Sequence, residues 1–568
     1  MHSVASVLLS DSRRTQAPAV AAVQLWCRSR RFCMILGFIG ADHEVTGSCH
    51  YLNVNGKHIL VDYGMEQGRN YFENAPLPVS PAEIDFVLIT HAHIDHTGNL
   101  PLLFKNGFRG RILATPATEA LCQIMLRDTA HIQMTEAEWK NRKAQRAGLP
   151  LVEPLYTMDD AVGCLKLFET VDYLEKRSLS EGITVRFIDV GHLLGSASIE
   201  FWLEENGVRK KIVFSGDIGN TDKPLIRDPS YVDDGDYAVM ESTYGDRFHL
   251  KEQVDHAKEL ASIMQETFDR GGNVVMPAFA VGRTQELLYF LRKIREEEMI
   301  KGHPDYEVWV DSPLALEATE VFKNNLLDCF DTETQELVRA GINPIAFRGL
   351  RTAVTAEESK AINFLQNPKV IISAAGMCDA GRIRHHLKHN LWRQDSTIVF
   401  AGYQAEGSLG RFLQDGAEKV KLFGEEIEVH AKLAMMKDMS SHADQDGLVR
   451  WITSFKKQMP SQVFVVHGDN EVTDSFCALL KEQHGIHAEA PYSGSLYDLA
   501  AGQWIRKTEG VPIVKESAAR RVANAVFERL LNSVTRLRRV AEANQGGTNK
   551  DLARFADQID ALSDKWSR

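Results

Sequence analysis

Residues 86–96 read FVLITHAHIDH, a hydrophobic strand that leads directly into His91, His93, Asp95 and His96. Residues 91 and 93 can turn toward one ion while residues 95 and 96 turn toward a neighbouring one. Imidazole and carboxylate together suit zinc and similar divalent ions. So many polar side chains rarely serve a hydrophobic core, because unpaired buried polar groups are costly. The segment therefore predicts a hydrolytic two-metal centre, and a solvated histidine-rich loop is the weaker alternative.

Two later segments share this layout, with a polar residue just past a β-rich run. His192 follows residues 183–190 (ITVRFIDV), and Asp217 follows residues 211–215 (KIVFS). Taken alone, such a histidine is more often a satisfied loop residue, and such an aspartate more often belongs to a turn. Their order at strand ends, after the HAHIDH segment, favours metal ligands instead.

The composition limits the class of protein. A chain of 568 residues predicts at least two domains, and 44% hydrophobic with 25% charged residues predicts a globular protein. No apolar run approaches the roughly 18 residues of a membrane span. The net charge of −12 argues against a protein that coats nucleic acid nonspecifically. A nucleic-acid enzyme stays open, since bound metal cations can dominate the field at a site.

The eight cysteines are scattered, and none forms a C-x-x-C pair. This usage is typical of free thiols in a reducing compartment, so we expect a cytoplasmic protein without a disulfide framework or a cysteine-rich zinc finger. Any metal must then be held by histidine and aspartate.

Changes in pattern divide the chain. Residues 34–245 alternate short β-rich runs with loops, residues 246–439 have an α/β pattern, and residues 440–510 return to β-rich character. Residues 511–568 carry two amphipathic helical patterns separated by a turn, a helical hairpin that could pack on its own chain or on a partner. Residues 1–33 are rich in arginine and precede the first convincing strand. A mis-called start is favoured there over an organelle transit peptide.

With these motifs in place, the chain resembles the metallo-β-lactamase superfamily. The segment GHLLG around His192 matches the superfamily's next histidine motif, and FSGD matches its metal-bridging aspartate, Asp217. Asp62 matches the early aspartate that supports the ligand loop by hydrogen bonding. Ala92 stands where di-iron relatives place a carboxylate, which disfavours oxygen chemistry.

The number of residues that precede the last ligand motif points to one family within the superfamily. After Glu241, in ESTYG, roughly 190 residues pass before the motifs SSHAD, with His442, and VVHG, with His467. That layout resembles the β-CASP nucleases, in the branch of the cleavage and polyadenylation endonuclease subunit and its prokaryotic relatives. The resemblance implies a four-layer αββα metallo-β-lactamase fold of class α/β, with an inserted α/β β-CASP domain and here a C-terminal helical tail.

The resemblance also implies a complete site. His91, His93 and His192 would hold one zinc ion, and Asp95, His96, Asp217 and His467 a second, although another divalent metal could serve. Two metals roughly 3.5–4 Å apart can share a hydroxide for in-line attack on a phosphate that they clamp. His442 would be the general acid, oriented and held protonated by Glu241. Asp95, Glu241 and His442 are thus the expected catalytic residues.

Two glycine-rich helix starts in the insertion could bind phosphates, because helix N-termini offer free N–H groups. One carries Arg283, and the other carries Gly376, Gly381 and Arg382. Each is weak evidence by itself, since such starts are also common for structural reasons.

Histidine at position 467, where DNA-processing relatives generally carry valine, points to RNA. The expected function is a zinc-dependent endoribonuclease of RNA processing or decay that acts on single-stranded RNA, without a membrane and with a homodimer as an option. Two alternatives remain: a catalytically silent scaffold of an RNA-processing complex, and a hydrolase of small esters, thioesters or lactams. The presence of all seven ligands argues against the first, and the capping insertion argues against the second.

Overall fold

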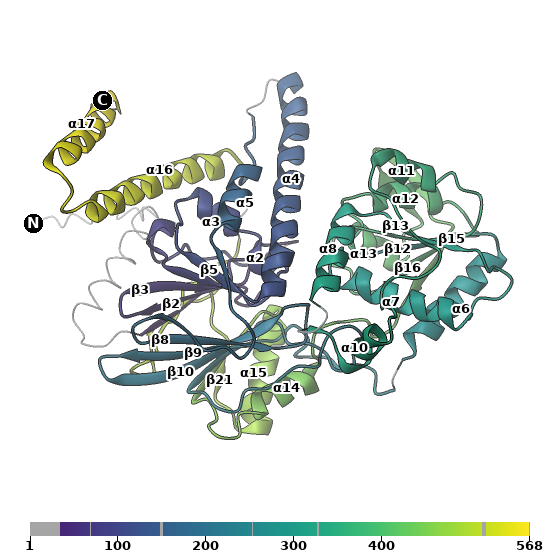
Figure 1. The fold of residues 1–568 in the computed structure, drawn as a ribbon, viewed down its shortest axis with the longest axis horizontal. Helices are drawn as coiled ribbons and strands as arrows, with labels where there is room; N and C mark the ends of the chain where they lie inside the picture. The colour runs from purple at the N-terminus through teal and green to yellow at the C-terminus, as the bar shows by residue number, and fades with distance from the viewer. Residues whose placement is uncertain are drawn as a thin grey trace, which may run out of the picture.

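The computed structural model describes residues 34–566, apart from residues 69, 148–150, 253, 326–328 and 514–517. The predicted N-terminal extension, residues 1–33, lies outside the described residues. The rest forms a body of two large sheets, a second body around a third sheet, and a C-terminal pair of helices (Figure 1).

The first large sheet has the strand order β23 (Gln503–Arg506), β22 (Leu496–Asp498), β1 (Ile35–Gly40), β2 (Cys49–Val54), β3 (Lys57–Val61), β4 (Phe86–Leu88), β5 (Arg111–Ala114) and β6 (Phe168–Thr170). The second has the order β21 (Ala488–Glu489), β20 (Gln462–Val466), β11 (Tyr237–Glu241), β10 (Val208–Phe214), β9 (Ala197–Glu205), β8 (Ile183–Asp189) and β7 (Arg177–Ser180). Their inner faces share one apolar core, to which Phe38, Phe201 and Phe464 contribute.

Helices cover the outer faces of both sheets. The helical elements of this body are η2 (Pro81–Glu83), α2 (Ile94–Thr97), α3 (Leu100–Lys105), α4 (Pro116–Ala147), α5 (Met158–Leu165), α14 (Gln445–Thr453) and α15 (Asn470–His484). Leu121 and Leu126 of α4 pack against the first sheet, and Trp451 of α14 and Phe476 of α15 pack against the second. Helices outside and two sheets inside confirm the predicted four-layer fold.

The third sheet is the inserted α/β domain. Its strands are all parallel and follow the order β14 (Leu350–Thr352), β13 (Glu307–Val310), β15 (Lys369–Ser373), β12 (Val274–Pro277), β16 (Thr397–Phe400) and β19 (Lys432–Met435). Around it lie α6 (His256–Asp269), α7 (Arg283–Glu296), α8 (Pro313–Asn324), α10 (Thr332–Arg339), α11 (Ala356–Ile362), α12 (Ile383–Asn390), α13 (Leu409–Gln414) and the hairpin β17 (Lys419–Leu422) with β18 (Glu425–Glu428).

The insertion leaves and re-enters the second sheet between two neighbouring strands. β11 and β20 pair in parallel, with Glu241 opposite Val466. The chain therefore builds the whole inserted domain between two strands that end side by side. This register brings Glu241 next to His467, which no local sequence pattern specifies.

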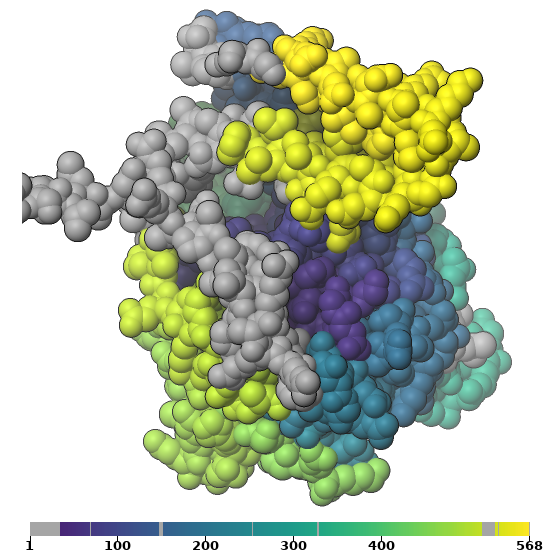
Figure 2. Space-filling view, turned by 90° about the vertical axis from the view of Figure 1, so that its left-hand side faces the viewer, coloured from purple at the N-terminus to yellow at the C-terminus, as the bar shows by residue number. Residues whose placement is uncertain are grey.

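The C-terminal tail consists of α16 (Ala518–Ala543) and α17 (Asn549–Trp566). Both predicted helices are present, but α17 turns away from the axis of α16 in Figure 1, so they form an open elbow and not a closed hairpin. Figure 2 shows the tail in yellow at the edge of the main body, above the N-terminal residues in purple. Arg538 pairs with Glu83 of η2 at 3.6 Å, which anchors α16 to the body.

Apolar side chains described on α16 are exposed. Phe527, Leu530, Leu531 and Val534 are each between 45% and 58% exposed. Although both tail helices are long, no helix in the described part of the chain is apolar enough over a sufficient length to cross a bilayer.

Candidate metal centre

The predicted ligands lie where strands of the two large sheets end. His91 and His93 follow β4, His192 follows β8, Asp217 follows β10 and His467 follows β20. Asp95 and His96 lie in the single turn of α2, which His93 caps, instead of in an open loop as the sequence suggested. The turn groups the side chains of Asp95 and His96 with His467, although the ring centroids of His91 and His96 are only 4.0 Å apart.

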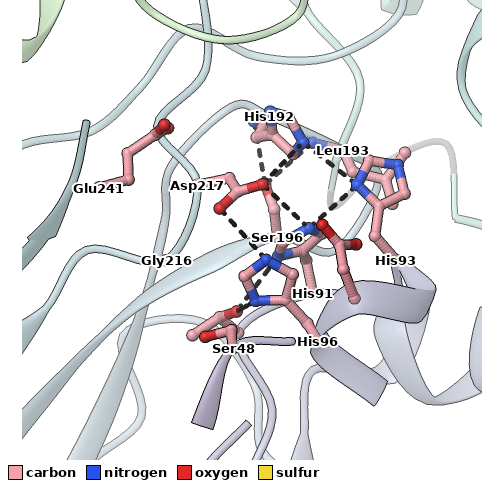
Figure 3. A network of polar contacts seen from close by, with 12 residues as sticks. Ser48, His91, His93, His96, His192, Leu193, Ser196, Gly216, Asp217 and Glu241 are labelled. Carbon is pink, nitrogen blue, oxygen red and sulfur yellow. Dashed lines mark hydrogen bonds and ion pairs between the residues drawn. The ribbon is translucent and has the colours of Figure 1, made fainter. Parts of the chain in front are cut away.

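The first group of side chains consists of His91, His93, His192 and one oxygen of Asp217 (Figure 3). Nδ1 of His93 lies 3.0 Å from Nε2 of His91 and 3.3 Å from Nε2 of His192. Oδ2 of Asp217 lies 3.5 Å from both of those Nε2 atoms. Zinc bonds of about 2.0–2.1 Å place tetrahedral ligands about 3.3 Å apart, so these four atoms have the spacing that the ion requires.

The second group consists of Asp95, His96, His467 and the other oxygen of Asp217. Nε2 of His96 lies 3.1 Å from Nε2 of His467 and 3.3 Å from Oδ1 of Asp217. Nε2 of His467 lies 3.6 Å from Oδ1 of Asp217 and 3.8 Å from Oδ2 of Asp95. Because its two oxygens face different groups, Asp217 is placed to bridge two cations.

The protonation of the first group also suits a metal. Burial lowers the pKa of His91 and of His192 well below the ordinary value of histidine. Both rings are therefore neutral at physiological pH, which is the form of imidazole that binds metal ions.

A buried carboxylate orients the ring of His96. Asp62 accepts hydrogen bonds from N and Oγ1 of Thr90 at 2.8 and 2.9 Å, and its Oδ2 lies 2.7 Å from Nδ1 of His96. The supporting role expected of Asp62 is thus confirmed. With its hydrogen on Nδ1, His96 turns the lone pair of Nε2 toward the metal site.

Two hydroxyl groups that the sequence did not single out support other ligands. Oγ1 of Thr243 lies 3.1 Å from Nδ1 of His467 and donates to the carbonyl oxygen of the same residue. Oγ of Ser196 accepts the backbone N–H groups of His192 and Leu193. Ser196 lies four residues from His192, a spacing too common to be recognised, and Thr243 lies 224 residues from His467, so local sequence does not identify either support.

Glu241 and His442 form a pair beside the two groups. Nδ1 of His442 lies 3.3 and 3.4 Å from the oxygens of Glu241, and its ring centroid lies 4.5 Å from that of His192. The carboxylate of Glu241 is buried and also accepts the backbone N–H groups of Ile218 and Thr243. With Nδ1 directed at Glu241, Nε2 is the atom of His442 that can act on a substrate.

The charge of Glu241 keeps His442 protonated. Burial alone would lower the pKa of His442, but Glu241, with further help from Asp217 and Asp95, raises it to about 9. His442 therefore carries its proton at neutral pH, as a general acid must.

The predicted phosphate-binding residues separate into two sets. Gly282 is the N-cap residue of α7, just before Arg283. A Cβ atom added to Gly282 would lie 3.1 Å from Leu193, the residue that follows His192. The start of α7 therefore adjoins the metal centre, and Gly376 packs against Phe279 just before it.

The other two residues serve the loop that leads into α12. Arg382 donates to Asp311 at 2.7 Å and to two backbone carbonyl groups. Gly381 has a φ of +77° and lies against the backbone of Ala374. The structure thus places Gly282 beside Leu193 and pairs the guanidinium of Arg283 with Glu286, whereas it commits the guanidinium of Arg382 to Asp311 in the inserted domain.

Three family profiles match the chain. The metallo-beta-lactamase superfamily profile matches residues 44–123, and the Beta-Casp domain profile matches residues 284–413. A profile described as a Zn-dependent metallo-hydrolase RNA specificity domain matches residues 426–491, which include His442 and His467.

Whole-length relatives agree with the profiles. Ribonuclease TTHA0252 of Thermus thermophilus is 36% identical over 438 residues, which cover 76% of this chain and 92% of the relative. An RNase J-like protein of Methanocaldococcus jannaschii is 29% identical, covering 82% of this chain and 99% of the relative. Transcription termination factor FttA of Pyrococcus abyssi is 28% identical, covering 81% and 70%.

Proposed function

The chain belongs to the metallo-β-lactamase superfamily, in the group with an inserted Beta-Casp domain, and on that premise we propose that it is a zinc-dependent endoribonuclease. The observation that carries the proposal is the placement of Asp217, whose two oxygens face two groups of metal-binding side chains next to His442. The ribonuclease among the relatives and the RNA specificity profile support RNA as the substrate.

The ligands divide as the geometry suggests. His91, His93 and His192 would hold one zinc ion, Asp95, His96 and His467 the other, and Asp217 would contact both. When bound, two such cations lower the pKa of water and offset the negative charge that builds up on the phosphate.

His442 and Glu241 supply the proton chemistry. A water molecule would first lose a proton to the solvent, and the resulting hydroxide would attack phosphorus in line. As the P–O3′ bond breaks, Nε2 of His442 gives its proton to the departing O3′. The products are a 3′-hydroxyl and a 5′-phosphate on the downstream fragment. Glu241 holds Nδ1 of His442 throughout and keeps the imidazolium form favoured between turnovers.

Phosphates on either side of the cut would contact the inserted domain. We assign that contact to Arg283, which follows Gly282 at the start of α7, and to Gly376, which packs against Phe279, and we propose that Gly381 and Arg382 hold the shape of their loop. Unpaired RNA reaches buried side chains such as His91 and His192 more easily than a duplex does, so single-stranded RNA is the proposed substrate.

The proposal is tested by cleavage of end-labelled single-stranded RNA with the metal-loaded protein. We expect internal cuts that leave 5′-phosphates, and loss of cleavage in His93→Ala and in His442→Ala. Equal cleavage by the wild type and His93→Ala would contradict the proposal. Absence of any nuclease activity with less than one bound ion per chain would support a catalytically silent scaffold. Turnover of small esters or lactams instead of RNA would support a small-molecule hydrolase.

Two further expectations belong to the same proposal. We place the enzyme in the cytoplasm on the basis of its scattered cysteines, and the six described ones are buried. We also propose that the exposed apolar face of α16 pairs with a second copy of the chain, giving a homodimer.

A further inference from the structure

His249 lies between the two bodies, in the segment that leads from β11 to α6, and only 12% of its side chain is exposed. Its Nε2 lies 2.9 Å from the backbone carbonyl oxygen of His442. Its Nδ1 lies 2.5 Å from Oδ1 of Asp438. The ring therefore connects the backbone of the proposed general acid to a carboxylate on the opposite side.

The two contacts determine which nitrogen of His249 donates a hydrogen bond to His442. A carbonyl oxygen only accepts hydrogen bonds, so Nε2 of His249 must carry a hydrogen and donate it to His442. Asp438 fixes the orientation of the ring from the Nδ1 side. Whichever of Nδ1 and Oδ1 holds the proton between them, Nε2–H is directed at the carbonyl group.

This donation completes the support of His442. The backbone N–H of His442 donates to Oγ of Ser440 at 3.2 Å, and Glu241 holds the ring. His249 supplies the contact on the carbonyl side. The backbone N–H of His249 in turn donates to Asp444, which also caps α14, so His249 is itself fixed to the same loop.

Asp438 extends the connection to the inserted domain. It follows β19, on the segment by which the chain leaves that domain, and its own carbonyl oxygen accepts from Nζ of Lys223. The pair of His249 and Asp438 thus joins the segment that enters the inserted domain, between β11 and α6, to the segment that leaves it after β19. A shift of the inserted domain would move this pair and, with it, the backbone of His442.

We propose that His249 is a positioning residue for His442, and that its pairing with Asp438 couples the placement of the inserted domain to proton donation. The inference rests on the proposed function, because it needs His442 to be the general acid.

Two amide substitutions separate the contacts of His249. Glutamine at this position places an amide N–H near the former Nε2 and can still donate to the carbonyl of His442, whereas asparagine reaches only the former Nδ1. His249→Gln and His249→Asn are therefore compared on RNA and on bis(4-nitrophenyl) phosphate, whose nitrophenolate departs without a proton. His303→Asn is the control, since His303 pairs with Asp269 at 3.0 Å within the inserted domain.

For His249→Asn we expect RNA cleavage to fall by roughly 10–100-fold while hydrolysis of the nitrophenyl ester stays within about twofold. His249→Gln should recover most of the RNA activity, and His303→Asn should resemble the wild type. Metal content and Tm are measured for each variant. A parallel loss on both substrates, or equal RNA activity of the two His249 variants, would overturn the inference.

The same assay separates this inference from its premise. If His442→Ala cuts RNA as well as the wild type, the proposed function fails. If His442→Ala loses RNA cleavage but still hydrolyses the nitrophenyl ester, the proposed function stands. If His249→Asn then cleaves RNA like the wild type, the positioning role of His249 is wrong.

Discussion

Oδ2 of Asp62 lies 2.7 Å from Nδ1 of His96, and both side chains are almost completely buried. This contact decides which nitrogen of His96 faces the metal site, because Asp62 holds Nδ1 and so directs Nε2 toward Asp217 and His467. Asp62, which is not itself a proposed metal ligand, therefore sets the orientation of a side chain in the second group.

Asp62→Asn should weaken zinc binding at the second group by roughly 10–100-fold, because an amide facing His96 no longer selects the same tautomer. Titration of the metal-free protein with zinc, followed by calorimetry, should show one weakened site and one unchanged site. Ser48→Ala is the control, since Ser48 lies 3.4 Å from Asp62 and makes only a marginal hydrogen bond. Equal weakening of both sites would contradict the assignment.

Asp217→Ala should reduce bound zinc from two ions per chain to one or none, because the substitution removes an oxygen from both groups at once. RNA cleavage should fall by at least about a thousandfold. Metal analysis by mass spectrometry checks the first result and an RNA assay the second. Asp233→Asn, which removes an exposed carboxylate paired with Lys457, should retain both ions.

Glu241→Gln should move the alkaline limit of RNA cleavage to lower pH. In the wild type the pKa of His442 is raised to about 9, so the acid is protonated at neutral pH and is lost only as the pH rises through that value. Without the carboxylate, burial lowers the pKa, and activity at about pH 8 should fall by roughly tenfold or more. Bound cations lower the value in both proteins, so the measured quantity is the difference between their pH–rate profiles. Coincident profiles would contradict the pairing of Glu241 with His442.

Removal of zinc by a chelator should lower Tm, and added zinc should restore it. Ligand binding stabilises the folded state by about 2.7 kcal/mol when the free ion exceeds its Kd a hundredfold. Differential scanning calorimetry with and without zinc measures the shift. In Asp217→Ala the shift should be mostly lost, and an undiminished shift would place the zinc elsewhere.

A chain that ends at residue 513 should be monomeric and should keep its RNA cleavage per chain. The reason is that Phe527, Leu530, Leu531 and Val534 are exposed on α16, whose described contacts with the main body are made to η2 and Gly107. Light scattering of the full and shortened chains compares their masses. A monomeric full-length chain would remove the proposed homodimer and leave the enzyme unaffected.

Much of the site was predictable from sequence because its ligands come in short motifs at strand ends. The hydrophobic run before His91 predicted β4, and the runs before His192 and Asp217 predicted β8 and β10. Local periodicity is sufficient to predict these elements, because a buried strand or helix face requires apolar residues at a regular spacing along the sequence.

The sequence by itself determined which residues could bind metal and where the inserted domain interrupts the fold. Only the tertiary structure decided that the oxygens of Asp217 face different groups, that Arg382 turns to Asp311, and that His249 supports the backbone of His442. The meeting of Glu241 with His467 likewise depends on the parallel pairing of β11 with β20, which are separated by the whole insertion. Local patterns carry no record of which distant strands pair, and so the partners of each side chain are set only when the sheet has formed.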